Sequence, residues 1–278
     1  MLNKNFNNKI YLVCYANGYL YEITQQKFIK SYKNVGIDDI VIWNKDKLIK
    51  TDFYKNNSKI LNEKNGKVTL LAWQPYIILD LLEQINENDF IIYADCSSKK
   101  YSIGFQYSVI PLLNYLHDNN LIYPGTHLFT EQNKLKYWTH NKTFEIMNVD
   151  KNIYGEKSMC QASYSIWRKN DLCKKLLTEW LYYCSQYECI KCIDNIKNFV
   201  ENVPLIRSQG SQSILSILIH KYNLKVFSPR GPFPSNIVTD EEKKDKKNGI
   251  HSYVRFLKNH NYIFQLACEN KLNDFINI

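Results

Sequence analysis

The segment WQPYIILDLLEQINENDFIIYAD, residues 73–95, decides the fold of this chain. Its first part carries apolar residues at helical spacing after Pro75, a residue that suits the first turn of a helix. Asn86 and Asn88 interrupt the pattern, and a short apolar strand then runs to Tyr93 and ends in an acid. Because this strand is continuously apolar, it predicts a parallel sheet that is covered on both faces.

Strands and helices alternate on both sides of this segment. The runs KIYLVCYA (residues 9–16) and VGIDDIVIW (35–43) predict two strands with a helix between them, which is a βαβ unit. The order of elements therefore predicts an α/β protein with a mixed, mostly parallel sheet flanked by helices. Beyond residue 95 we expect helices at 106–116, 143–147 and 171–184, strands at 121–123 and 160–168, and a helix followed by a strand within 211–227.

For two of these helices the sequence also predicts an N-cap or a buried face. Ser211 is expected to be the N-cap of the helix that it begins. No internal repeat and no linker interrupts the 278 residues, so a single domain over 1–278 is the simplest division. The helix at 171–184 should bury one apolar face, formed by Leu172, Leu176, Leu177, Trp180 and Leu181.

The net charge is +9, from 36 lysines and arginines against 27 aspartates and glutamates, which favours partners that carry phosphate. The basic residues are dispersed, and the densest charged run, DEEKKDKK at 240–247, is mixed in sign. We therefore expect no nucleic acid partner. No apolar run reaches the roughly 18 residues of a membrane span, and the N-terminus lacks a secretory pattern, so we expect a cytoplasmic chain without a transmembrane segment.

Three of the eight cysteines, Cys184, Cys189 and Cys192, lie close together in the sequence. With Cys173 or Cys268 they would offer four thiolates to zinc. A second closely spaced pair of ligands is missing, so reduced thiols without a metal are the favoured interpretation.

Asp95 follows directly on the predicted buried strand. In open α/β sheets, ligands bind beyond the carboxyl ends of the strands, so Asp95 lies where a ligand would bind. The structural alternative is an aspartate that caps a turn or the next helix.

Four segments, taken in order, resemble a known group of proteins. The group tends to have W-K-P, a helix and then D-hydrophobic-Y-x-D, as in residues 73–95. The other matches are WTHNKTFEIMN (138–148), QASYSIWRKND with EWLYYC (within 161–184) and QSILSILIHKYNLKVF (212–227). Together they resemble bacterial and viral glycosyltransferase-like proteins of GT-A fold, over most of the chain from about residue 10 to 228.

The resemblance implies a Rossmann-like nucleotide-binding half over about residues 1–100 and an acceptor-binding half over about 101–278. It implies transfer of a hexosyl or related sugar from a nucleotide-sugar donor, such as a UDP- or GDP-sugar, to a glycan or other acceptor. Asp95 resembles the first acid of the DxD element, which holds the ribose and, through Mn²⁺ or Mg²⁺, the diphosphate. His251 is a candidate second metal ligand.

Three positions depart from the pattern of the group. Ser97 stands where the DxD element has its second acid, which leaves metal dependence open. Gln74 replaces the lysine of W-K-P, so a cation that would face the donor phosphates is missing. Gln212 matches the glutamine of a frequent Asp-Gln pair, but Ser211 replaces the acid, which would have been a base or an acceptor anchor.

Further candidates come from the strand ends and loops. Gln161 is expected to bond the donor sugar and joins Gln212 and Ser211 as a candidate catalytic residue; it could also be exposed without a role. Trp73 and Tyr93 could stack on a nucleobase or line the site, but a tryptophan beside the start of a helix more often lies in the core. The remaining candidates are Tyr15, Ala16 and Asn17 for the donor pocket, Arg207 for a phosphate, and Glu131, His140 and Glu156 for the acceptor side.

The leading hypothesis is therefore a glycosyltransferase whose Asp95 binds the donor directly or through a divalent cation. The alternative is a catalytically silent GT-A-like protein that binds a nucleotide, a glycan or a protein. It is motivated by the changes at Ser97, Gln74 and Ser211. Neither hypothesis specifies retention or inversion at the sugar, or the oligomeric state.

Overall fold

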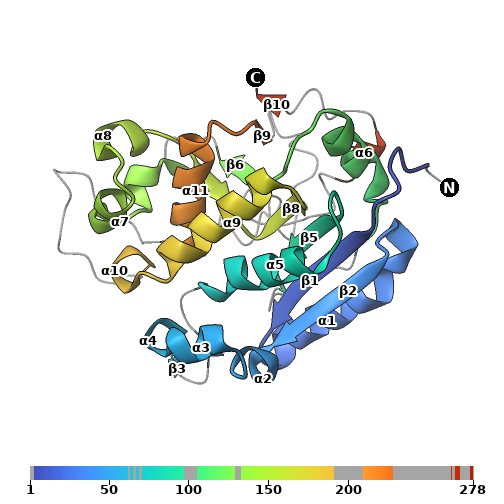
Figure 1. Cartoon of the computed structure of the whole chain (residues 1–278), viewed down its shortest axis with the longest axis horizontal. Coiled ribbons are helices and arrows are strands. Elements are labelled where there is room, and N and C mark those ends of the chain that lie inside the picture. Colours follow the sequence, from blue (N-terminus) through green and yellow to red (C-terminus); the bar gives the residue numbers. More distant parts are fainter. Residues whose placement is uncertain are drawn as a thin grey trace, which may run out of the picture.

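Three parallel strands and one antiparallel strand form the main sheet, in the order β2-β1-β5-β8 (Figure 1). The computed structural model describes residues 3–61, 63–64, 67–68, 71–96, 105–128, 133–190, 209–227, 264, 267–269 and 276–277. β1 (Ile10–Ala16) pairs in parallel with β2 (Asp39–Asn44) and β5 (Phe90–Ala94), and β8 (Tyr164–Arg168) is antiparallel to β5. The predicted mixed, mostly parallel α/β sheet is confirmed.

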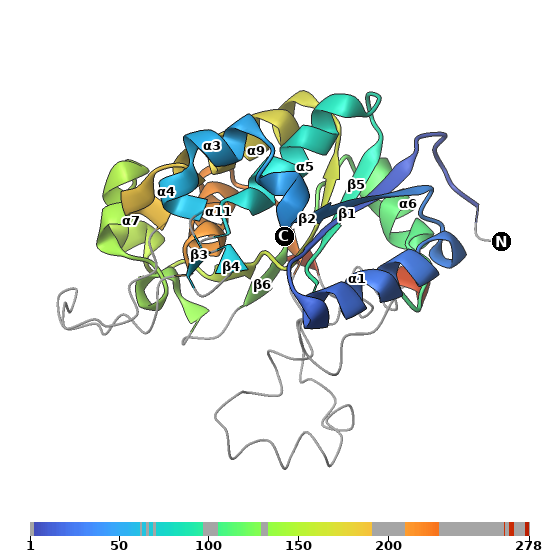
Figure 2. The ribbon, with the colours of Figure 1, turned by 90° about the horizontal axis from the view of Figure 1, so that it is seen from below.

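Alternate residues of the central strands face opposite layers of helices. Val13, Tyr15 and Tyr93 belong to the apolar core beneath α5 (Trp73–Gln84) and α9 (Asp171–Cys184). Leu12, Cys14 and Ile92 belong to the core on the other face, with α1 (Tyr19–Ser31) and α6 (Ile110–Asp118). Figure 2 shows the two layers, with α5 and α9 on one side of the sheet and α1 on the other. Every residue of β5 is buried, as the continuous apolar run predicts.

α9 has the bounds that the sequence predicts, but its buried face is shifted by one residue. Asn170 caps it by accepting the N–H of Cys173 at 2.8 Å. Leu172, predicted to be buried, is 42% exposed, because it lies one residue, or about 100°, away from the buried line. Leu181 is only partly buried. The buried line is formed by Cys173, Leu176, Leu177, Trp180 and Cys184.

A second sheet has the order β10-β9-β6-β7. The single strand predicted at 160–168 is wrong, because the chain turns at Ala162 and Ser163. The part before the turn joins the second sheet, and the part after it is β8 of the main sheet. The strands of the second sheet are β6 (Thr126–Leu128), β7 (Met159–Gln161), β9 (Val226–Phe227) and β10 (Ile276–Asn277).

Other boundaries also differ from the predictions. The helix expected at 106–116 begins later, because Pro111 occupies the first turn of α6. The strand expected at 121–123 is a single bridge between Tyr123 and Ile166. Gly210, with φ 48°, is the N-cap of α11 (Ser211–Lys221), so the prediction that Ser211 caps this helix is wrong. The remaining elements are η1 (Lys33–Val35), α2 (Lys45–Leu48), α3 (Asp52–Asn56), α4 (Ser58–Leu61), β3 (Glu63–Lys64), β4 (Lys67–Val68), η3 (Leu135–Tyr137), α7 (Asn141–Ile146), α8 (Lys151–Tyr154) and α10 (Tyr187–Ile190).

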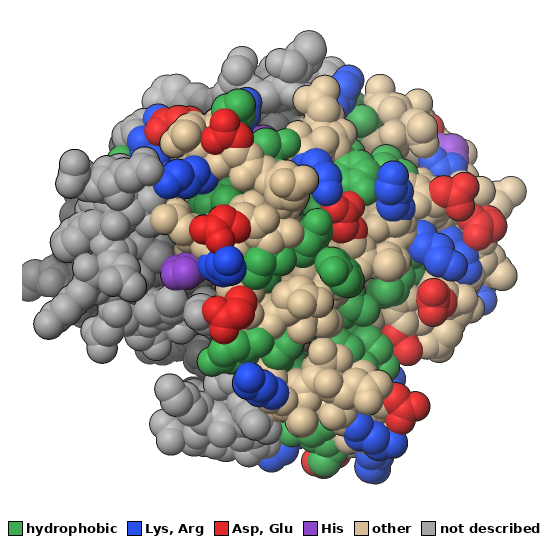
Figure 3. Space-filling model, turned by 60° about the vertical axis from the view of Figure 1, so that its left-hand side comes forward, with side chains coloured by type: hydrophobic (Ala, Val, Ile, Leu, Met, Phe, Trp, Pro, Cys, Tyr) green, Lys and Arg blue, Asp and Glu red, His purple; other side chains and the backbone are tan. Residues whose placement is uncertain are grey.

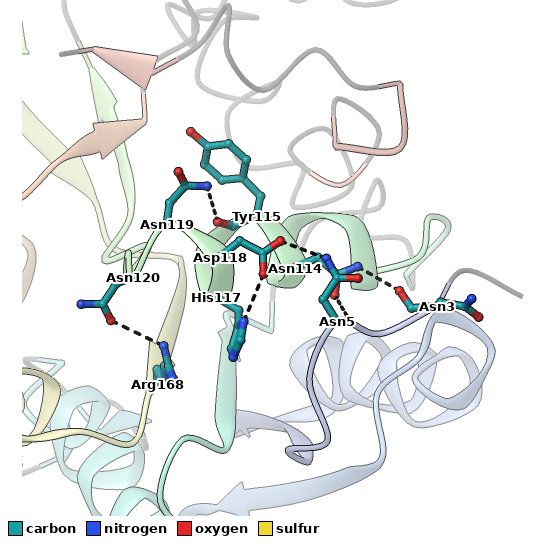
Figure 4. Close-up of polar contacts among 9 residues, drawn as sticks. All are labelled: Asn3, Asn5, Asn114, Tyr115, His117, Asp118, Asn119, Asn120 and Arg168. Carbon is teal, nitrogen blue, oxygen red and sulfur yellow. Dashed lines mark hydrogen bonds and ion pairs between the residues drawn. The ribbon is translucent and has the colours of Figure 1, made fainter.

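The N-terminal segment is held against α6 at the amino end of β1 (Figure 4). Asn114 donates to the carbonyl of Asn3 and accepts the N–H of Asn5, both at 2.9 Å. The side chain of Asn5 also donates to Asp118 at 2.9 Å, and this hydrogen bond, followed by the one from His117, lowers the pKa of Asp118. These contacts hold the segment before β1 against α6, whereas α1 begins beyond the opposite, carboxyl end of β1.

Charges of both signs are interspersed among the described residues of the face shown in Figure 3, and these residues form no continuous basic stripe there. Within the described residues, no helix is long and apolar enough to cross a membrane.

His220, in the last turn of α11, gives the fold a pH dependence. Its Nε2 donates to the carbonyl of Ser158 at 2.8 Å, and burial lowers its pKa below the ordinary value. The unfolded chain therefore binds a proton more readily, and the free energy of unfolding should rise with pH from about 5 to 7. His220→Gln, which keeps a donor, should flatten that rise in urea unfolding measured at several pH values. An unchanged slope would contradict this origin.

Candidate functional site

The carboxyl ends of β1, β2 and β5 lie at one edge of the main sheet, where Asp95 is found. Asp95 is exposed, and its N–H donates to the carbonyl of Ser163 at 2.9 Å. Ser163 lies just before β8, whose first residue, Tyr164, pairs with Ala94. The first residues of the antiparallel strand therefore meet the last residues of the parallel strands. A ligand in an open α/β sheet binds beyond this edge.

Tyr93 fixes one oxygen of the Asp95 carboxylate. Its ring is completely buried, and its hydroxyl donates to Oδ1 of Asp95. Burial, followed by the charge of Asp95, raises the pKa of Tyr93 well above its ordinary value, so the hydroxyl remains a donor at all physiological pH values. The alternative in which Asp95 caps the next described helix does not hold, because the N-cap of α6 is Val109.

Tyr15 and Trp73 form an aromatic stack on the same face of the sheet. Their ring centroids are 4.2 Å apart at 28°, and the residues are 7% and 6% exposed. Both rings are therefore covered mainly by protein, as the core alternative for Trp73 describes. Of the other residues predicted there, Ala16 is buried and Asn17 is partly exposed, directly before the first turn of α1.

Three glutamines from three elements converge on the turn between β7 and β8. Nε2 of Gln74 donates to the carbonyl of Ala162 at 2.5 Å, and Oε1 of Gln212 accepts the N–H of Ala162 at 3.4 Å. Gln161, directly before Ala162, is 6% exposed. Its Oε1 is buried and has no hydrogen-bond partner among the described residues. A buried acceptor of this kind is costly unless a partner arrives, so it suits a ligand that donates a hydrogen bond.

Ser211, the other candidate catalytic residue, faces the protein interior. It is 1% exposed, its carbonyl accepts Nε1 of Trp180 at 2.9 Å, and its hydroxyl lies beside the thiol of Cys184. The structure therefore pairs Asp95 with Tyr93 and Ser163, places Gln74 and Gln212 on the adjacent Ala162, and buries Ser211 in contacts of its own.

Two candidates for the acceptor side have structural contacts. His140 caps α7, because its Nδ1 accepts the N–H of Lys142 at 3.1 Å. Glu156 forms ion pairs with Lys134 and Lys136, and their hydrogen bonds lower its pKa. Four predicted residues, Ser97, Glu131, Arg207 and His251, lie outside the described residues.

The described residues offer few ligands for a metal ion. They contain no group of three or more His, Cys, Asp or Glu side chains placed to hold a metal ion. At the carboxyl edge they supply the carboxylate of Asp95, which is too few oxygens for Mn²⁺ or Mg²⁺ without further ligands. In the cysteine cluster, burial raises the pKa of Cys184 and, to about 12, that of Cys189; Cys192 is not described.

Three residues that contribute to this edge were not predicted from the sequence. Ala162 and Ser163 act through their backbone groups, which no side-chain pattern reveals. Gly125 has φ 152°, and a Cβ added to it would lie 2.4 Å from the carbonyl oxygen of Gln161. The Pro124-Gly125 pair is a turn signal that could have indicated an unusual backbone here.

The fold and this edge define an α/β protein whose sheet is compatible with a Rossmann-like fold, with polar side chains gathered beyond the carboxyl ends of its parallel strands. Comparison of the chain with protein-family models, with curated proteins and with solved structures found no match.

Proposed function

We propose that this chain is a GT-A-type glycosyltransferase that uses a nucleotide-sugar donor, with Asp95 binding the donor. The observation that carries the proposal is the position of Asp95 at the carboxyl edge of the sheet, where Tyr93 holds its carboxylate and Ser163, two residues after Gln161, accepts its N–H. This is the edge at which open α/β sheets bind nucleotides. The four segments that resemble glycosyltransferases provide independent support.

The chemistry of the edge suits a sugar nucleotide. A carboxylate held by Tyr93 accepts hydrogen bonds from ribose or sugar hydroxyls. The buried Oε1 of Gln161 is an acceptor for another hydroxyl. The net charge of +9 favours a partner that carries a diphosphate. We assign no step to Mn²⁺ or Mg²⁺, because the described residues supply one carboxylate for a cation.

A second candidate is a nucleotide- or glycan-binding protein without transferase activity. Gln74 and Gln212 use their side chains to hold the backbone of Ala162, and Ser211 is buried. Gln74 and Ser211, two of the positions that depart from the glycosyltransferase pattern, thus have structural contacts here, which favours a fold that binds without reacting. In both cases we propose a cytoplasmic location.

A thermal-shift screen tests both candidates. The purified protein is measured with UDP, GDP, CMP, dTDP and their common sugar derivatives, with and without Mn²⁺. We expect the midpoint to rise with one nucleotide family, because a ligand that binds only the folded state stabilises it. Donor hydrolysis or transfer then supports the enzyme, and binding without turnover supports the silent protein. No shift with any nucleotide contradicts the nucleotide site.

A further inference from the structure

The peptide groups of Ala162 are held from two sides by glutamines of two helices. Gln74, in the first turn of α5, donates to the Ala162 carbonyl at 2.5 Å, and Gln212, in the first turn of α11, accepts the Ala162 N–H at 3.4 Å. Gln74 is 2% exposed and Ala162 is 3% exposed. Water therefore cannot readily replace either glutamine, and loss of one would leave a buried peptide group without a partner.

This turn joins the two sheets, follows Gln161 directly and includes Ser163, which bonds to Asp95. β7 before it belongs to the second sheet, and β8 after it belongs to the main sheet. Gln161 precedes Ala162, and Ser163 follows it with the carbonyl that accepts the N–H of Asp95 at 2.9 Å. A shift of the Ala162 peptide would therefore move Gln161 and Asp95 together.

We propose that Gln74 and Gln212 are positioning residues that hold this turn and so place Gln161 and Asp95 for the ligand. The part that concerns the donor rests on the proposed function. The two glutamines have opposite polarity, because Gln74 must donate a hydrogen bond whereas Gln212 must accept one. This difference separates their roles from general packing, since packing would treat the two amides alike.

Substitution by glutamate tests whether each glutamine must donate or accept its hydrogen bond. Gln212→Glu keeps an acceptor for the Ala162 N–H. Gln74→Glu places a carboxylate against the Ala162 carbonyl when it is ionised and regains a donor when it is protonated, which lower pH favours. Gln74→Met removes the donor without adding charge, so it stays informative if the charged variant unfolds at neutral pH.

Hydrogen exchange measured by mass spectrometry on peptides covering 159–167 and 90–96 reads the turn directly. Relative to the unmodified chain at the same pH, we expect Gln74→Glu and Gln74→Met to exchange about tenfold faster at pH 7.5, as the loss of one buried hydrogen bond implies. Gln212→Glu should exchange as the unmodified chain does. At pH 5, Gln74→Glu should recover and Gln74→Met should not.

Gln25→Glu is the matched control. Gln25 is 7% exposed and donates to the carbonyl of Trp43 at 3.1 Å, so it is a buried glutamine with the same polarity at another place. This variant should leave exchange in 159–167 unchanged.

Two results would overturn the positioning role: unchanged exchange in Gln74→Met, or equally fast exchange in Gln212→Glu and Gln74→Glu at pH 7.5. The nucleotide screen on the unmodified chain keeps the two proposals apart. If no nucleotide binds but the exchange pattern is as expected, the turn is held as described and the proposed function fails. If a nucleotide binds but exchange does not respond, the positioning role fails alone.

Discussion

Replacing Asp95 by asparagine is expected to weaken nucleotide-sugar binding by about 10- to 100-fold, since a hydrogen bond to a charged group contributes about 1.5–3 kcal/mol. Asparagine keeps the volume and still accepts the hydrogen bond from Tyr93, so only the negative charge is lost. The free energy of unfolding should change by less than about 1 kcal/mol, because Asp95 is exposed beyond the end of β5. Isothermal titration calorimetry and urea unfolding measure the two quantities.

Two further variants test whether the charge of Asp95 is the cause of the lost affinity. Tyr93→Phe removes the hydroxyl that holds Asp95 but keeps its charge, so donor affinity should fall by less than in Asp95→Asn. Asp52→Asn, an exposed acid in α3, should leave the affinity unchanged. Unaltered donor binding in Asp95→Asn, together with a stability loss above about 2 kcal/mol, would instead show that Asp95 serves the fold.

The segment at 73–95 was predictable because local signals agree there. Pro75 in a first turn, apolar residues at helical spacing, and a strand without polar residues each specify one outcome, and α5 and β5 follow. The position of Asp95 at the carboxyl edge followed from the parallel sheet alone. Its contact with Ser163 could not be predicted, because Ser163 bonds through its backbone carbonyl and a side-chain pattern does not reveal such a contact.

The break in the strand predicted at 160–168 depends on tertiary contacts. QASYSIWR alternates like one strand, and its residues carry no strong turn signal. The turn is held by Gln74 and Gln212, which are 88 and 50 residues away from Ala162 in the sequence. Both glutamines were predicted to face a ligand, but their side chains bond to the protein backbone. Because the residues in these contacts are far apart in the sequence, the contacts could not be predicted from it.

Gly125→Ala is expected to have the largest effect on the fold, with a loss of about 3 kcal/mol or more in the free energy of unfolding. The new Cβ would lie 2.4 Å from the carbonyl oxygen of Gln161 and 2.5 Å from Sγ of Cys160. The first of these atoms belongs to the backbone of β7, so a side chain cannot relieve the contact by rotating. The backbone at φ 152° adds strain for any residue with a Cβ.

Gly18→Ala separates the free-energy cost of the steric contact from the cost of the backbone strain. Gly18 also has a positive φ, of 98°, but nothing lies within 4 Å of an added Cβ. This variant should lose about 1–3 kcal/mol, the cost of a backbone conformation that is essentially confined to glycine, and so less than Gly125→Ala, which adds the steric contact. Because β6 pairs with β7 at Thr126 and Gln161, the contact in Gly125→Ala should also displace Gln161, and donor affinity should fall with stability. Equal losses in the two variants, with donor affinity kept in both, would mean that β7 moves freely and that Gln161 is not held in place by Gly125.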